Sequence, residues 1–144
     1  MHPSATIALL CATLFAGAAL YITLVEHPAR LGLEDGPLLA QWQPSYKRAL
    51  PIQSGLAVAG GLAGAVSGWY DADWRWFAGS IALLANWPFT LVVMMPANKR
   101  LMGMDSADAG ADSRAALVRW GKQHAVRAAL GALAVVLFAW AAGG

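Results

Sequence analysis

The chain alternates between long apolar stretches and shorter polar connections. The apolar stretches cover residues 5–25, 52–70, 77–95 and 125–142. The first carries no charge over 21 positions, and about 31 Å of helix at 1.5 Å per residue is enough to cross a bilayer core. It is too long and too poor in basic residues for a signal peptide, so we expect it to be retained. The pattern predicts an all-α integral membrane four-helix bundle in a single domain, residues 1–144.

Three details refine these spans. In the second span, Gly60, Gly64 and Gly68 repeat every four residues, a ridge of small residues that lets another helix approach closely. The ridge could pack inside one bundle or between the subunits of a homo-oligomer. In the third span, Pro88 removes the amide that would bond to the carbonyl of Leu84, so we expect a kink there. The last helix is predicted to begin near residue 113, with an amphipathic start over residues 113–124.

Charge orients the spans. Charged residues make up 12% of the chain, apolar residues 58%, and the formal net charge is only +2, which excludes a nucleic-acid-binding module and an ordinary soluble enzyme. All Lys and Arg residues except Arg75 lie in the connections 26–51 and 96–124 or just beyond them. The positive-inside rule therefore predicts a multi-pass protein of a bacterial-type inner (plasma) membrane, with those connections cytoplasmic and both termini outside. An outer aromatic belt is expected from Trp69, Tyr70, Trp74 and Trp76.

The two halves of the chain share a weak repeat. Each has a span, a Pro-Ala pair with a basic residue close by, a polar connection, and then Trp-x-x-x-aromatic. The last element reads Trp42-x-x-x-Tyr46 in the first half and Trp120-x-x-x-His124 in the second. This order predicts two parallel two-helix repeats related by an axis along the membrane normal. Tyr46 and His124 would then face each other near that axis.

Polar residues that are costly to bury gather at the predicted cytoplasmic end. Trp120, His124 and Arg127 share one helix face. Ionisable groups in spans usually face inward and pair, so we expect Arg127 to pair with Glu26, either as a clamp between two helices or as part of a site. The imidazole of His124 suits general-base chemistry at neutral pH, or else it bonds to connection backbone.

Other side chains at this end have more than one possible role. Trp42 and Tyr46 would line an entrance or anchor the chain at the interface, and Asn86 in the third span is expected to bond to a neighbouring helix.

A metal ion is a further option at the same end. Glu26, His27 and His124 form a plausible ligand set for a transition metal. The chain contains no Glu-x-x-His or His-x-x-x-His spacing, so no motif supports a metal. No histidine lies in the middle of a span, where a buried haem would need one. We therefore expect no buried haem, and the resemblance described next implies that no organic cofactor is needed.

These residues together resemble the anthrone-oxygenase-like family of small four-helix integral membrane proteins, whose bacterial members are mostly uncharacterised. The resemblance lies in Glu26 with Pro28 and Arg30, Trp42 with Tyr46, the run 86–90 leading to Pro96 and Asn98, and Trp120 with His124 and Arg127. It implies oxidation of the activated methylene of a polycyclic aromatic anthrone to a quinone, using dioxygen without an added organic cofactor. It also implies that Trp120 and His124 are the first positions to test.

The implied chemistry suits the residues. His124 would remove the methylene proton, and Arg127, Asn98 or Tyr46 would stabilise the phenolate-like oxygen. Trp120 would stack on the ring system. The expected partners are a hydrophobic small molecule, dioxygen and membrane lipid, and the substrate-binding candidates are Tyr46, Trp42, Asn98 and Asn86.

The sequence does not establish that the chain is an enzyme. One alternative is a non-catalytic membrane binding or assembly protein that holds a lipid headgroup, a metal ion or a partner subunit. A small transporter is disfavoured, because no continuous line of polar residues crosses the second and fourth spans.

Overall fold

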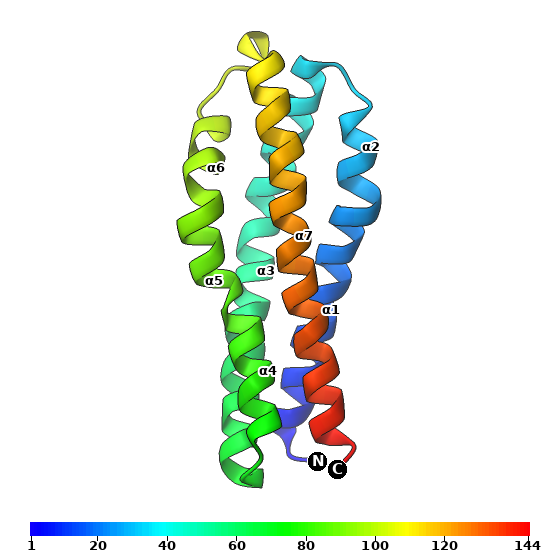
Figure 1. Ribbon diagram of the computed structural model, residues 1–144, viewed down its shortest axis with the longest axis vertical. Coiled ribbons are helices and arrows are strands. Elements are labelled where there is room, and N and C mark those ends of the chain that lie inside the picture. The colour runs from blue at the N-terminus through cyan, green and yellow to red at the C-terminus, as the bar shows by residue number, and fades with distance from the viewer.

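The computed structural model describes residues 1–144 and contains only helices and short connections (Figure 1). The first unit is α1 (Pro3–Tyr21), a π-helical turn η1 (Ile22–Glu26) and α2 (His27–Leu31); the second is α3 (Asp35–Asp71). The third unit is α4 (Trp74–Leu84), α5 (Asn86–Phe89), a second π-helical turn η2 (Thr90–Met94) and α6 (Met95–Met102). A short 3-10 turn, η3 (Ser106–Asp108), leads to the fourth unit, α7 (Ala111–Ala142). The predicted all-α four-helix bundle is confirmed.

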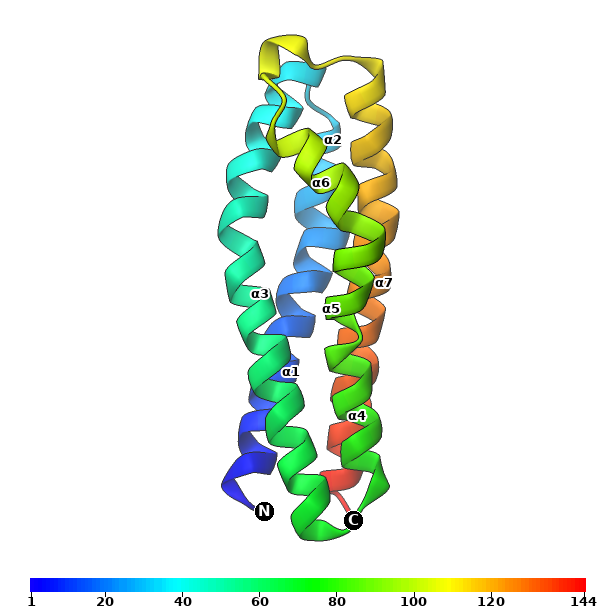
Figure 2. The ribbon, with the colours of Figure 1, turned by 90° about the vertical axis from the view of Figure 1, so that its left-hand side faces the viewer.

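The four units run up and down around a common axis. α1 packs against α3 and α7, and α4 packs against the same two helices, which is the arrangement of a four-helix bundle with short connections. Both termini and the turn after α3 lie at one end, and the other two connections lie at the opposite end (Figures 1 and 2). We call the latter the basic end, because it carries all Lys and Arg residues except Arg75 and the more deeply placed Arg127. All four units are long and apolar enough to cross a membrane, so the chain is a multi-pass membrane protein.

The segment 26–51 differs from its prediction. We expected a polar connection, but it is helical except at residues 32–34, and α3 continues through Pro44 and Pro51. Leu38 and Trp42 lie about one turn apart on α3, and both are buried in a cluster that also contains Trp120 of α7. Polar residues on the other faces of this stretch made the helical spacing of its buried apolar residues hard to recognise in the sequence. Tertiary packing stabilises the stretch as a helix.

Proline explains the two π-helical turns. Pro28 and Pro96 lack the amide that would bond to the carbonyl four residues earlier. The residue before each proline bonds one position further back instead, His27 to Ile22 and Met95 to Thr90. Both halves thus place a π-helical turn one residue ahead of Pro-Ala, a feature that the two halves share.

Pro88 interrupts the third unit, as predicted. The helix breaks between Leu84 and Asn86, and the Asn86 side-chain amide donates to the Leu83 carbonyl over 3.0 Å.

The glycine ridge packs inside the bundle. A Cβ added to Gly60 would lie 2.8 Å from Leu83, and one added to Gly64 would lie 2.6 Å from Phe138. A Cβ on Gly68 would likewise meet a side chain of α4, at 2.8 Å. The ridge is therefore used for close contact between α3 and its neighbours in the same chain.

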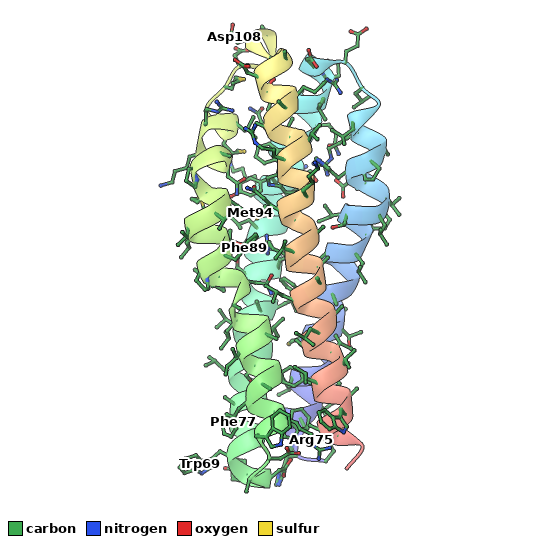
Figure 3. All side chains as sticks on the ribbon, viewed as in Figure 1. Trp69, Arg75, Phe77, Phe89, Met94 and Asp108 are labelled. Atoms are coloured by element: carbon green, nitrogen blue, oxygen red, sulfur yellow. The ribbon has the colours of Figure 1, made fainter.

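The termini end carries an exposed aromatic belt, with one exception to the prediction. Trp69, Tyr70 and Trp74 are exposed, and Trp69 points away from the bundle in Figure 3. Trp76, expected in the belt, is instead buried in the core. In the turn beside the belt, the hydrogen bonds from the Arg75 side chain hold the pKa of Asp73 below its ordinary value.

Candidate functional site

An aromatic column joins α3 to α7 in the half of the bundle nearest the basic end. Trp42 and Tyr46 are stacked on α3, with ring centres 4.8 Å apart, and Trp120 and His124 are stacked on α7 at the same separation. Trp42 meets the Trp120 ring edge-on at 5.8 Å. The four-residue spacing in each half places both members of a pair on one helix face, so the repeat identified in the sequence builds this column.

His124 is buried beside a small cavity. The His124 residue is 2% exposed, and its Nδ1 lies 3.1 Å from Thr23 Oγ1 in η1. Tyr46 and His124 line the same cavity, together with Gln53 and Arg127. Its volume is about 20 Å³, which is room for one water molecule.

His27 plays a different part. Its Nε2 lies 2.8 Å from the carbonyl of Leu117, and its ring packs 4.9 Å from Trp120. The same ring rests on Gly121, where an added Cβ would come within 2.6 Å of it. His27 therefore joins the first unit to α7.

The expected pair between Glu26 and Arg127 does not form. Glu26 Oε1 accepts from Arg30 Nη2 and from Ser45 Oγ, each over 2.6 Å, and from Gln41 over 3.4 Å. Glu26 and Arg30 lie four residues apart on adjoining helical turns, so the nearer guanidinium takes the carboxylate. Arg30, which is only 4% exposed, also lies over the Trp120 ring at 6.0 Å.

Arg127 is consequently a buried cation without a carboxylate. It is 5% exposed and forms no salt bridge. Its Nη2 donates to Gln53 Oε1 over 3.1 Å, and its guanidinium lies 5.6 Å from the centre of the Phe15 ring. The Nε group has no partner. A site with this electrostatic balance attracts an anion or a strong hydrogen-bond acceptor.

Side chains of the third unit hold the Tyr46 hydroxyl in place. Asn98 of α6 donates from Nδ2 to the Tyr46 hydroxyl over 3.2 Å, and that hydroxyl donates to Met95 Sδ at 4.0 Å. Asn98 Oδ1 is buried without a partner. Asn86, the other predicted substrate-binding amide, lies further from the basic end and lines a separate groove, which Arg127 shares.

The structure does not assemble the candidate metal ligands. No three His, Cys, Asp or Glu side chains are arranged to hold a metal ion. Glu26 is held by Arg30, and His27 and His124 are bonded to different partners. These three residues therefore do not form the ligand set suggested by the sequence.

Two side chains of the site were not singled out from the sequence. Gln53 follows Tyr46 by seven residues, two helical turns, so its position on the same face of α3 was a usable signal. Thr23 lies in an apolar span and meets His124 only through the tertiary packing of η1 on α7. No local pattern marks that contact.

Comparison with known families gives one finding. The family model described as anthrone oxygenase matches residues 42–137, about two thirds of the chain. The matched region includes Tyr46, Trp120, His124 and Arg127, while Glu26 lies before it. Comparisons with curated proteins and with solved structures give no match.

Proposed function

The chain belongs to the anthrone oxygenase family, and on this premise we propose that it is a membrane-embedded oxygenase. Its proposed substrate is a hydrophobic aromatic molecule of the anthrone or phenol type, and its oxidant is dioxygen. The concentration of basic residues at one end favours a cytoplasmic position for that end. The proposed reaction centre lies in the half of the bundle nearest to it.

The observation that carries the proposal is the lone positive charge of Arg127. An unpaired buried ion costs several kcal/mol, and ionisable groups kept inside spans are usually functional. Deprotonation of an anthrone methylene yields an anion whose charge spreads to the ring oxygen. Arg127 would stabilise that oxygen as the charge develops, without first breaking a salt bridge.

His124 is the proposed base. If its Nδ1–H donates to Thr23 Oγ1, Nε2 is left as an acceptor and can take the methylene proton. Trp120 is only 4% exposed, and its ring, stacked on His124, would hold the imidazole in place. Tyr46, held by Asn98, would contribute a second polar contact to the oxygen.

The reaction balances without a further oxidant. The anion gives one electron to dioxygen, and the resulting radical pair joins to form a carbon–oxygen bond. His124 returns the first methylene proton to the peroxide. Loss of the second methylene proton and cleavage of the O–O bond then yield the carbonyl and one molecule of water, which carries both protons. The methylene carbon loses four electrons and dioxygen gains four, so the protein supplies position, a base and electrostatic stabilisation.

Oxygen consumption by the purified protein in lipid nanodiscs, with anthrone as substrate, tests the proposal. We expect uptake above a protein-free blank and a loss of at least about 100-fold in His124→Ala, since general-base catalysis contributes roughly 10²–10⁴-fold. His2→Ala is the matched control, because His2 lies exposed near the opposite end. Uptake no faster than the blank, or equal rates in parent and His124→Ala, would contradict the proposal.

The small cavity at His124 favours a second candidate. A volume of about 20 Å³ does not admit a ring system without movement of the surrounding side chains. A non-catalytic membrane protein that holds an anionic headgroup at Arg127 would need less space. Retained binding of an anionic lipid in a protein with no oxygen uptake would favour this candidate.

A further inference from the structure

A second hollow lies next to the cavity at His124, between α3 and the α5–η2 segment. We call it the lateral groove; it is lined by Leu50, Ser54, Ala57, Asn86, Trp87, Thr90, Leu91, Met95 and Arg127. Its volume is about 100 Å³, five times that of the cavity at His124.

The groove follows from the breaks in the third unit. Near the termini end, α4 lies against the glycine ridge of α3. Beyond the break at Ala85 the third unit packs less closely on α3. Figure 2 shows the two standing apart above α5, before α6 leans back towards α3. Trp87 and Leu91, at the groove, are exposed on the outer surface of the bundle. In a bilayer that surface meets acyl chains, so the groove opens sideways to lipid.

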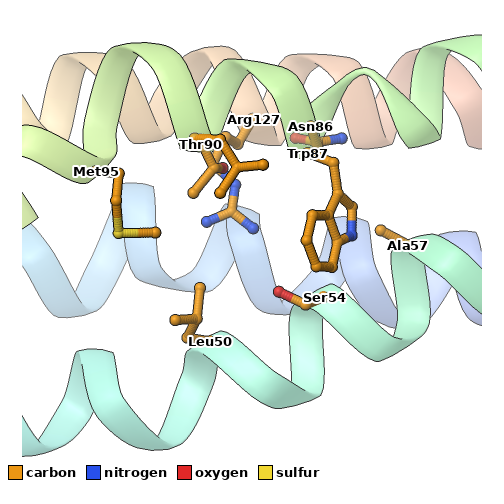
Figure 4. Close-up of a pocket in the computed structure, with 9 residues that line it drawn as sticks. Leu50, Ser54, Ala57, Asn86, Trp87, Thr90, Met95 and Arg127 are labelled. Carbon is orange, nitrogen blue, oxygen red and sulfur yellow. The ribbon is translucent and has the colours of Figure 1, made fainter.

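Three polar groups around the groove lack partners. Asn86 Oδ1, Thr90 Oγ1 and Arg127 Nε form no hydrogen bond, although their residues are only 2%, 7% and 5% exposed. Asn86 and Thr90 lie one helical turn apart, so both face the groove from one side. Figure 4 shows the Arg127 guanidinium between Thr90 and Leu50 of α3. A buried polar group without a hydrogen bond destabilises the protein, and a ligand with oxygen groups would recover part of that loss.

We infer that the lateral groove binds a flat aromatic molecule carrying hydroxyl or ketone oxygens, which enters it from the lipid. The apolar walls contact the rings, while Thr90, Asn86 and Arg127 bond to the oxygens. The inference rests on the proposed function for the identity of this molecule as a substrate. Arg127 lines both hollows, so an oxygen held there lies at the boundary between the groove and the cavity of His124.

Binding of 1,8-dihydroxyanthraquinone, followed by quenching of tryptophan fluorescence in nanodiscs, tests the inference. A groove site gives saturable quenching, whereas partition into the bilayer gives a linear response. Ser54→Leu fills the groove from α3 and is expected to weaken binding at least tenfold. Gly55→Leu is the matched control: it adds the same side chain to the next residue, which is exposed and has open space around its Cβ position. We expect it to bind as the parent does.

Thr90→Val provides a second variant that keeps the shape of the side chain. Thr90 Oγ1 makes no hydrogen bond in the protein, so the substitution breaks no internal contact. We expect about three- to tenfold weaker binding of the hydroxylated probe, the effect of one hydrogen bond. Binding of anthracene, which has no oxygen, should not change.

The outcomes separate this inference from the proposed function. Linear quenching in the parent, or identical curves for Ser54→Leu and Gly55→Leu, would overturn the groove and indicate bilayer partition or an acyl chain in its place. Oxygen uptake that depends on His124 but is unaffected by Ser54→Leu would also overturn it, while leaving the oxygenase intact. Saturable binding that Ser54→Leu removes, in a protein without oxygen uptake, would support the groove and refute the oxygenase.

Discussion

Replacing Arg127 by methionine should separate function from stability. The substitution roughly keeps side-chain volume and removes a buried charge that has no carboxylate partner. It loses the hydrogen bond to Gln53 and leaves Gln53 Oε1 unpaired, at a cost of about 1–3 kcal/mol. Removing the unpaired guanidinium also removes the free-energy cost of its burial, which is several kcal/mol. The two terms nearly balance, so we expect the variant to be as stable as the parent or slightly more so.

Glu26→Ala is the contrasting change in the same region. Arg30 is 4% exposed, and Glu26 is its only carboxylate partner. Leaving one member of a buried pair alone costs about 3–5 kcal/mol, and the partial exposure of Glu26 places the expected loss near the lower value. We therefore predict that the ion pair between Glu26 and Arg30 contributes to stability. The unpaired charge of Arg127 is predicted to contribute to the reaction instead.

Thermal unfolding in detergent and oxygen uptake in nanodiscs measure the two effects. For Arg127→Met we expect no fall in Tm and a rate about 10²–10³-fold lower, the usual effect of removing one donor to a developing oxyanion. For Glu26→Ala we expect a clear fall in Tm. If Arg127→Met lowered Tm as much as Glu26→Ala and kept the parent rate, the assignment of Arg127 to the reaction would be refuted.

Three further changes test other parts of the structure. Gly121→Ala places a Cβ 2.6 Å from His27, so calorimetry should show a loss of about 1–3 kcal/mol from overpacking. Thr23→Val removes the bond to His124 and leaves its buried Nδ1 unpaired, at a cost of about 1–3 kcal/mol. Uptake should fall several-fold with a modest fall in Tm, and an unchanged rate would argue against a positioning role of Thr23. Because the pKa of Asp73 is lowered in the fold, its contribution to stability is present above the ordinary aspartate pKa and fades as pH falls through the lowered value. Parent and Asp73→Asn unfolding curves should therefore converge in acid.

Local rules predicted much of the fold from the sequence. The uncharged run 5–25 and the other apolar stretches predicted the spans, and Pro88 predicted the break in the third unit. The same rules did not reveal that residues 35–51 are helical, because that stretch is held by Trp42 packing on α7 rather than by apolar composition. Contacts between residues far apart in the chain, such as Trp42 and Trp120, are the hardest to predict from a single sequence.

The site was predicted in part for a related reason. Spacing alone placed Trp120, His124 and Arg127 on one face, and the repeat placed Tyr46 opposite His124. The predicted partner of Arg127 was wrong. Glu26 pairs instead with Arg30, which lies four residues further along the same helical unit. Competition between a local and a distant partner depends on distances, which spacing along the chain does not supply.

Proton removal by the buried imidazole is the step on which the account depends most. Exchange of the anthrone methylene protons in D₂O, measured without oxygen, isolates that step from oxidation. The account predicts exchange faster than the protein-free background for the parent and exchange at background for His124→Ala, with both proteins equally folded. Exchange at background for the parent, or equal acceleration by both proteins, would contradict it.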